Sequence, residues 1–400
     1  MVYGKIVKIY HWGIDGETRG LYDMERKRRE KQKAWLLRRL MMVPVVIAAF
    51  FLIETFGEDK SYVMAQQNDP NQEEELQTGD AASLAGVYYR RENDGRKSQR
   101  LRTRPYYKVS EGSQILYDVS GNVVWQADTI APETVELLRA YVQERNQVYE
   151  WENSFEKTLK INELDQKILE TAGCTFPNVK INFIGDSITE GFGGSQDTDG
   201  RQISYVYYVQ EALQFEEVCN HGRGSATIAP YSDNDERAIG AHEDEFFLGE
   251  YEITVFYAGV NDFLAGPEVK DFGVLDGGTT EGYCGELQRI VNSMKTKCPN
   301  TLFFFVTAYP TFAQASLHVK YINFDGIPTL DDYMNPIRIM AQRNGYPVID
   351  IYNTGLMDTH DADTAENFLS DWIHPNDAGY RILGEHIAAE ILLYCLGIVE

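Results

Sequence analysis

Residues 181–191 read Ile-Asn-Phe-Ile-Gly-Asp-Ser-Ile-Thr-Glu-Gly, an apolar strand that runs into a small acidic turn carrying one serine. A serine in such a turn is often a helix N-cap or an ordinary turn residue. It can also be the nucleophile of a catalytic site. Ser187 is therefore a candidate nucleophile, and the residues that follow the other strands decide between these interpretations.

After residue 177 the chain alternates regularly between strand-like and helix-like segments. The predicted strands are 179–184, 216–219, 253–258, 302–307 and 348–351. The predicted helices are 204–214, 281–297, 330–344 and 377–396. Strands that alternate with helices imply a parallel sheet with helices on both faces. The predicted fold is a three-layer α/β/α domain with a five-stranded parallel sheet.

Polar turns follow several of these strands, and they all fall on one edge of the predicted sheet. In open parallel sheets the ligand site forms at the carboxyl ends of the strands. Residues 185–188, 220–227, 259–262 and 371–375 all lie at that edge. Four unrelated turns would not be expected to bring a nucleophile, a base and hydrogen-bond donors together there. The pattern therefore favours nucleophilic catalysis over a set of ordinary turns.

The spacing of Asp371 and His374 suits a base and the group that orients it. Three residues apart in a turn, the carboxylate can accept from one imidazole nitrogen while the other nitrogen faces Ser187. Pro375 stiffens the turn just before the last predicted helix. These three side chains are the candidate triad.

The turns resemble the four blocks of the SGNH (GDSL-type) hydrolases, in the order of that family. The blocks are Gly185-Asp186-Ser187-Ile188, the glycine-rich turn after Asn220, Gly259-Val260-Asn261-Asp262 and Asp371-x-x-His374-Pro375. The resemblance covers about residues 178–396. It implies a flavodoxin-like SGNH hydrolase domain at 173–400 that acts on ester bonds without a cofactor or a metal.

The same resemblance implies a role for each residue of the triad. Ser187 would attack an ester carbonyl, His374 would take its proton and later protonate the leaving alkoxide, and Asp371 would orient His374. Asp186 and Asp262 are interpreted as side chains that fix their turns.

The resemblance also implies an oxyanion hole. Asn261 would donate its side-chain amide, and the backbone N–H of Ser187 and one from the second block, at Gly224 or Ser225, would complete it. The second block departs from the family, because Ser225 stands where the family has a glycine. This departure bears on the local φ and ψ angles and on the room beside the acyl group.

Composition excludes some classes of partner. The 37 basic and 61 acidic residues give a net charge of −24, which disfavours nucleic acid. The 43% of hydrophobic residues are enough for a sizeable core. The five cysteines show no CxxC pair, so neither a zinc site nor a disulfide scaffold is indicated.

The N-terminal region predicts a membrane attachment. A basic segment, 1–39, is followed by an apolar run, 40–56, which as a helix would span about 26 Å of a hydrocarbon core of roughly 30 Å. The basic flank places the N-terminus in the cytoplasm and the C-terminal part across the membrane. The run is interpreted as an anchor, and cleavage as a signal segment after residue 65 is the alternative.

Two further segments precede the hydrolase domain. Residues 57–83 are polar and acidic and are interpreted as a flexible linker. Residues 84–172 form an accessory segment, with short strands at 86–89, 114–118 and 122–126 and one or two helices over 132–171. The break at 120–122 indicates a hairpin.

These inferences favour an extracytoplasmic, membrane-anchored esterase that removes short acyl groups, such as acetyl, from carbohydrate. The partner would be a small acyl ester or an acylated glycan. Alternatives within the same fold are an acyltransferase that moves acetyl to a glycan hydroxyl and a lipase. A glycan-binding protein without turnover is the alternative of a different class.

Overall fold

The computed structural model describes residues 106–110, 113–117, 123–126, 130–232, 235–266, 271–275, 282–311 and 328–399. All of them belong to one structural unit, Thr78–Glu400. The segments predicted at 1–39, 40–56 and 57–83 and the strand predicted at 86–89 lie outside the described residues. Within the described ranges, no helix combines the length and the apolar character that crossing a membrane requires.

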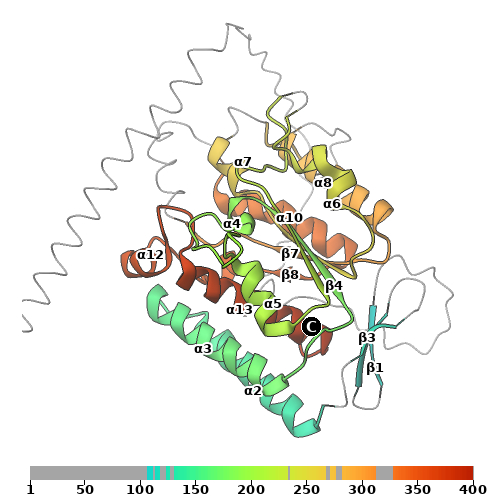
Figure 1. Cartoon of the computed structure of the whole chain (residues 1–400). Helices are drawn as coiled ribbons and strands as arrows, with labels where there is room; N and C mark the ends of the chain where they lie inside the picture. Colours follow the sequence, from blue (N-terminus) through green and yellow to red (C-terminus); the bar gives the residue numbers. More distant parts are fainter. Residues whose placement is uncertain are drawn as a thin grey trace, which may run out of the picture. The chain divides into compact units, whose positions relative to one another are not determined.

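Five parallel strands form the central sheet (Figure 1). They are β4 (Lys180–Gly185), β5 (Glu217–Gly222), β6 (Ile253–Tyr257), β7 (Leu302–Val306) and β8 (Val348–Ile349). Their order is β5-β4-β6-β7-β8, so the direction of strand addition reverses beside β4 as in flavodoxin-like folds. The predicted α/β fold with a five-stranded parallel sheet is confirmed.

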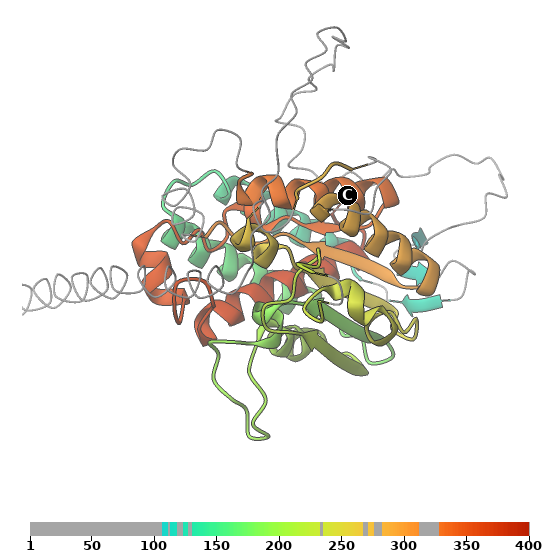
Figure 2. The same cartoon turned by 90° about the horizontal axis from the view of Figure 1, so that it is seen from above.

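Helices cover both faces of this sheet. The longer ones are α5 (Tyr205–Leu213), α8 (Gly282–Lys297), α10 (Leu330–Asn344) and α13 (Asp377–Cys395). Helix α5 packs on α13 and helix α10 packs on α8, which gives a layer on each face (Figure 2). These helices lie within a residue or two of the predicted ranges, because side chains at Ser204, Thr329 and Asn376 cap three of their N-termini.

Short helical segments occupy many of the connections, and the sequence did not predict them. They are α4 (Ser187–Glu190), η2 (Ile239–His242), α6 (Glu243–Phe246), α7 (Val260–Ala265), α11 (Ile351–Thr354) and α12 (Ala362–Phe368). Strands β4, β6 and β7 are buried almost throughout, which explains why their sequences are mostly apolar.

Two strands of the central sheet differ from the predicted ones by more than one residue. Strand β5 continues to Gly222, beyond the predicted end at 219, because Asn220 and His221 keep their pairing with β4 at the edge of the sheet. The His221 side chain has a hydrogen-bond partner in the strand, because its Nδ1 lies 2.8 Å from Asn182 Oδ1 of β4. Strand β8 stops at Ile349 rather than 351, because the Asp350 side chain caps helix α11.

The segment before the sheet contains two helices and a separate small sheet. Helices α2 (Pro132–Val148) and α3 (Ser154–Ala172) confirm the helical prediction for 132–171. Strands β1 (Tyr106–Ser110), β2 (Ser113–Tyr117) and β3 (Val123–Gln126) form an antiparallel sheet, so the predicted hairpin is present. Strand β1 was not predicted. Helix α3 packs on α13, and the domain boundary at 172/173 stays a prediction.

A buried group of charged side chains joins α2 and α3 to α13. Arg145 of α2 contacts both Asp165 of α3 and Glu390 of α13. Asp165 also accepts from His386 of α13, whose Nδ1 lies 2.8 Å from Asp165 Oδ2. Arg145, Asp165 and His386 are all at most 2% exposed, so the charges of Arg145 and Asp165 depend on their partners for stabilisation.

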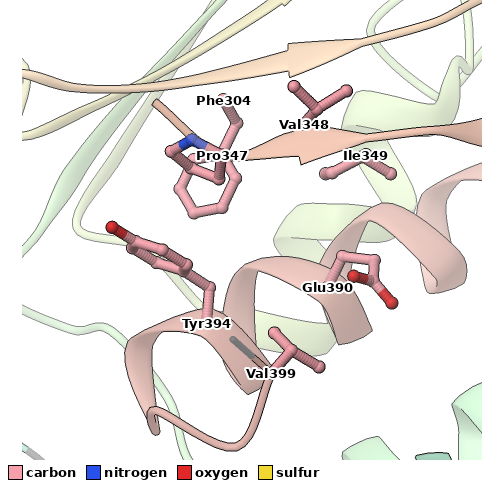
Figure 3. Close-up of a pocket in the computed structure, with 7 residues that line it drawn as sticks. All are labelled: Phe304, Pro347, Val348, Ile349, Glu390, Tyr394 and Val399. Carbon is pink, nitrogen blue, oxygen red and sulfur yellow. The ribbon is translucent and has the colours of Figure 1, made fainter. Parts of the chain in front are cut away.

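Beside this group lies a small hollow of about 10 Å³ between β7, β8 and α13 (Figure 3). Its lining residues are Phe304, Pro347, Val348, Ile349, Glu390, Tyr394 and Val399. The rings of Phe304 and Tyr394 meet edge to face, with their centroids 5.3 Å apart. None of these residues belongs to the predicted site.

The buried charges give a prediction about stability. Arg145→Met should lower the free energy of unfolding by about 3–5 kcal/mol, because Asp165 and Glu390 lose the cation that they share. Arg139→Met is the matched control on the same helix, since the exposed Arg139–Glu136 pair contributes less than about 1 kcal/mol. Urea unfolding of the two variants measures the difference. Equal losses in both would contradict the stabilising role of the buried group.

Candidate active site

Three turns begin side by side at the carboxyl edge of the sheet, because β4 lies between β5 and β6. Gly185 of β4 is in register with Gly222 of β5 and with Tyr257 of β6. The turns that follow are the first three sequence blocks, with Ser187 in the middle one. The structure therefore brings these blocks together on one edge.

Ser187 lies at the start of α4, directly after a tight turn. An added Cβ at Gly185 would lie 2.0 Å from Thr189 Oγ1 and 2.5 Å from the carbonyl oxygen of Tyr257, so only glycine fits there. Asp186 caps α4 by accepting from the N–H of Ile188 at 2.9 Å. As the first residue of a helix, Ser187 has an N–H that needs no acceptor within the helix.

Ser187, His374 and Asp371 form a continuous chain of hydrogen bonds. Ser187 Oγ lies 2.9 Å from His374 Nε2, and His374 Nδ1 lies 2.8 Å from Asp371 Oδ2. Since a carboxylate only accepts, the proton of the neutral imidazole sits on Nδ1 and Nε2 accepts from the serine hydroxyl. This arrangement can remove a proton from Ser187.

The Asp371 carboxylate is held in its ionised form. Its other oxygen accepts from the backbone N–H groups of Ile373 at 2.8 Å and His374 at 2.7 Å. Burial alone would raise the pKa of Asp371, but the hydrogen bonds from the His374 side chain and from these N–H groups outweigh it. The pKa therefore lies below its ordinary value, and the carboxylate stays charged at neutral pH.

Backbone contacts fix the turn that carries His374. The N–H of Ser370 donates to the carbonyl oxygen of His374 at 2.8 Å, and the hydroxyl of Tyr309 donates to the carbonyl oxygen of Ile373. Asn376 then caps α13 two residues after His374. The imidazole is thereby held by rigid elements rather than by a free loop.

Asn261 lies at the start of α7, after strand β6, which is a neighbour of the strand that leads to Ser187. Its Nδ2 donates to the carbonyl oxygen of Ala226 at 3.0 Å, and its own carbonyl oxygen accepts from Tyr231 at 3.0 Å. The amide nitrogen carries a second hydrogen, which an oxyanion beside Ser187 could accept. The oxyanion role of Asn261 stays a prediction.

The second block lies beside the nucleophile turn, where the N–H of Arg223 donates to the carbonyl oxygen of Gly185 at 3.1 Å. Ser225 has a φ of 60°, the left-handed conformation that glycine adopts more easily, at a cost of roughly 1–2 kcal/mol. The departure from the family pattern thus falls at a position that favours glycine. The roles of Gly224 and Ser225 as oxyanion donors stay predictions.

Two carboxyl groups in the turns of the site, those of Asp186 and Asp262, are buried. Asp262 accepts from the N–H of Ile228 at 2.8 Å and from that of Ala229 at 2.9 Å, so it ties the third block to the residues that directly follow the second block. Burial raises the pKa of Asp262 to about 7, although these N–H groups lower it in part. Burial likewise raises the pKa of Asp186 to about 6, with the Ile188 N–H acting against it.

A model of the GDSL-like lipase and acylhydrolase family matches residues 183–382, which is half of the chain. The chain belongs to this family. It is a GDSL-type hydrolase that acts on esters. No curated protein matches it.

Solved structures similar to this GDSL-type hydrolase include the following three proteins. A protein from Lactobacillus plantarum is 20% identical, with 55% of this chain and 96% of that chain covered and a TM-score of 0.44. A variant of an acetyl-xylooligosaccharide esterase from Geobacillus Stearmophilus is 20% identical, with coverages of 54% and 95% and a TM-score of 0.40. A carbohydrate acetylesterase family member from Sinorhizobium meliloti is 17% identical, with coverages of 55% and 99% and a TM-score of 0.38.

The structure adds two residues to the site of this GDSL-type hydrolase. The ring of Phe192 lies 4.5 Å from the imidazole of His374, between ring centroids. Tyr231 holds the backbone of Asn261. Phe192 could have been found from the sequence, because it is the apolar residue in the glycine-rich stretch 191–194. Nothing in the sequence singles out Tyr231. Across the described ranges, no cluster of three or more His, Cys, Asp or Glu side chains could hold a metal ion.

The position of Asn261 gives a prediction for catalysis. Asn261→Ala should lower kcat by about 10²–10³, because one donor to the oxyanion is lost. Asn367→Ala is the control, since the side chain of Asn367 donates only to the carbonyl oxygen of Asp363 within α12. Steady-state ester hydrolysis and the thermal midpoint of both variants would be measured. A kcat that falls less than about threefold in Asn261→Ala would contradict the oxyanion role.

Proposed function

We propose that this protein is an extracytoplasmic serine esterase that removes short acyl groups, acetyl above all, from carbohydrate. The observation that carries the proposal is the chain of hydrogen bonds from Ser187 through His374 to Asp371, with distances of 2.9 and 2.8 Å. Nucleophile, base and orienting carboxylate have the relations that acyl transfer to a serine requires.

In the first half of the reaction, Ser187 Oγ attacks the acyl carbonyl while its proton passes to His374 Nε2. Asp371 stabilises the imidazolium that forms. The oxyanion of the tetrahedral intermediate accepts from the N–H of Ser187, from the amide of Asn261 and from one backbone N–H at Gly224 or Ser225. The intermediate collapses when His374 gives its proton to the leaving alcohol oxygen, which leaves an acyl-enzyme.

In the second half, water replaces the alcohol. His374 Nε2 takes a proton from the water as its oxygen attacks the acyl carbonyl, and the same donors hold the second oxyanion. Collapse of this intermediate returns the proton to Ser187 Oγ and releases the carboxylic acid. The cycle consumes one ester and one water.

The polar surroundings of the site support a short acyl group over a long one. Residues 193–202, which follow the nucleophile turn, are all polar or glycine, and most of them are exposed. A lipase acting on long chains would need an apolar cover over the site. The carbohydrate substrate is supported by the extracytoplasmic location that the N-terminal sequence predicts.

The nucleophile assignment is tested by substitution. Ser187→Ala should abolish release of acetate from acetyl esters and labelling by a fluorophosphonate, because no hydroxyl remains to be acylated. Ser370→Ala is the matched control, because it removes the hydroxyl that donates to the carbonyl oxygen of His374 but keeps the backbone N–H that holds the same oxygen, so the variant should still be labelled. Turnover or labelling that survives in Ser187→Ala would show that the proposed mechanism is wrong.

The membrane attachment is a separate part of the proposal. Residues 40–56 would anchor the esterase with its C-terminal part outside the cytoplasm. After washing of membranes at alkaline pH, the full chain should stay in the pellet and a chain lacking 40–56 should not. A soluble product that begins at residue 66 would instead support cleavage of a signal segment.

A further inference from the structure

Phe192 is an exposed aromatic side chain at the candidate site. Its side chain is 56% exposed although it is large and apolar. The part that is covered lies against His374, with ring centroids 4.5 Å apart and the planes inclined by 57°. Among the exposed large apolar side chains of the described residues, Phe192 is the one whose ring contacts His374, the candidate base.

Backbone hydrogen bonds fix the position of Phe192. The N–H of Phe192 donates to the carbonyl oxygen of Ser187 at 2.9 Å, and its own carbonyl oxygen accepts from the hydroxyl of Tyr380 at 2.7 Å. Gly193 follows at a φ of 94°, and an added Cβ there would lie 2.2 Å from Ser370 Oγ. The loop is therefore pressed against the turn of His374, and the ring position is preorganised.

The chemistry of the site decides which half of the substrate meets this ring. The carbonyl oxygen of the ester must point toward the oxyanion donors. The donors predicted at the second block and at Asn261 follow β5 and β6, the strands on either side of β4 and its Ser187 turn. The leaving oxygen must approach His374 Nε2 to receive its proton. A ring that lies against His374 therefore borders the alcohol and not the acyl group.

We propose that Phe192 is a specificity-determining residue that forms the subsite for the alcohol half of the ester. Its exposed face suits a cyclic alcohol that presents an apolar C–H or ring face, such as a pyranose, over a small acyclic alcohol. Dispersion and ring contact of this kind need no charge on the ligand. This inference rests on the proposed serine esterase mechanism.

The test compares esters that share the acetyl group and differ in the alcohol. The full chain, purified in mild detergent, would be assayed with ethyl acetate, cyclohexyl acetate and a monoacetylated methyl xylopyranoside. In Phe192→Ala, kcat/KM for the two cyclic substrates should fall on the order of 3- to 10-fold more than for ethyl acetate. Phe192→Trp should keep the parent's ratio, because it retains an aromatic face.

Two controls separate this role from a structural one. Leu248→Ala removes another exposed apolar side chain, which lies shortly before β6 at the opposite edge of the sheet, and should leave the ratio unchanged. The ratio of cyclohexyl butyrate to cyclohexyl acetate should also be unchanged in Phe192→Ala, because only the acyl group differs.

The outcomes are distinguishable. A parent that hydrolyses all three acetates, with the same ratio in Phe192→Ala, would overturn the alcohol subsite and leave the esterase mechanism standing. A change in the acyl ratio instead of the alcohol ratio would place Phe192 on the acyl side and overturn the inference. A parent that hydrolyses none of them would overturn the proposed function together with the subsite.

Discussion

The hydrogen bond between Ser187 Oγ and His374 Nε2 joins side chains that are 187 positions apart in the sequence. At 2.9 Å it requires two turns from different parts of the chain to be placed within a few tenths of an ångström of each other. The sheet makes this possible on one side, because Gly185 brings the end of β4 against Tyr257 and leaves the serine at the rim. On the other side, the cap at Asn376 ties the His374 turn to α13.

Helix α3 contacts segments of the chain on both sides of the His374 turn. Thr158 Oγ1 accepts from the N–H of Met357 at 3.0 Å, and Ser154 Oγ donates to the carbonyl oxygen of Asp358 at 3.0 Å. Asp165, farther along the helix, holds His386 of α13. Helix α3 thus contacts the chain both before and after the His374 turn. Helix α3, which the sequence assigned to an accessory segment, is therefore bound to the same part of the chain that carries His374.

Much of the fold could be predicted, because local signals and tertiary packing agree there. The buried strands β4, β6 and β7 are mostly apolar, and α10 begins and ends at the predicted residues because Thr329 caps it and Gly345 follows it. The end of β5 could not be predicted, since polar residues there are tolerated at a sheet edge. The contact between Phe192 and His374 depends on the positive φ angles of Gly191 and Gly193. The hydrogen bond from the N–H of Ile228 to Asp262 depends on tertiary packing. The spacing of residues in the sequence encodes neither contact.

The central claim is that the ester's acyl group passes through Ser187. The most direct measurement is peptide mass spectrometry of the enzyme quenched in acid during turnover of an acetyl ester. We expect one added acetyl group on the peptide that contains Ser187, because the acid quench stops deacylation and traps the acyl-enzyme. Steady hydrolysis with no acylated peptide, or with the acetyl group on another residue, would contradict it.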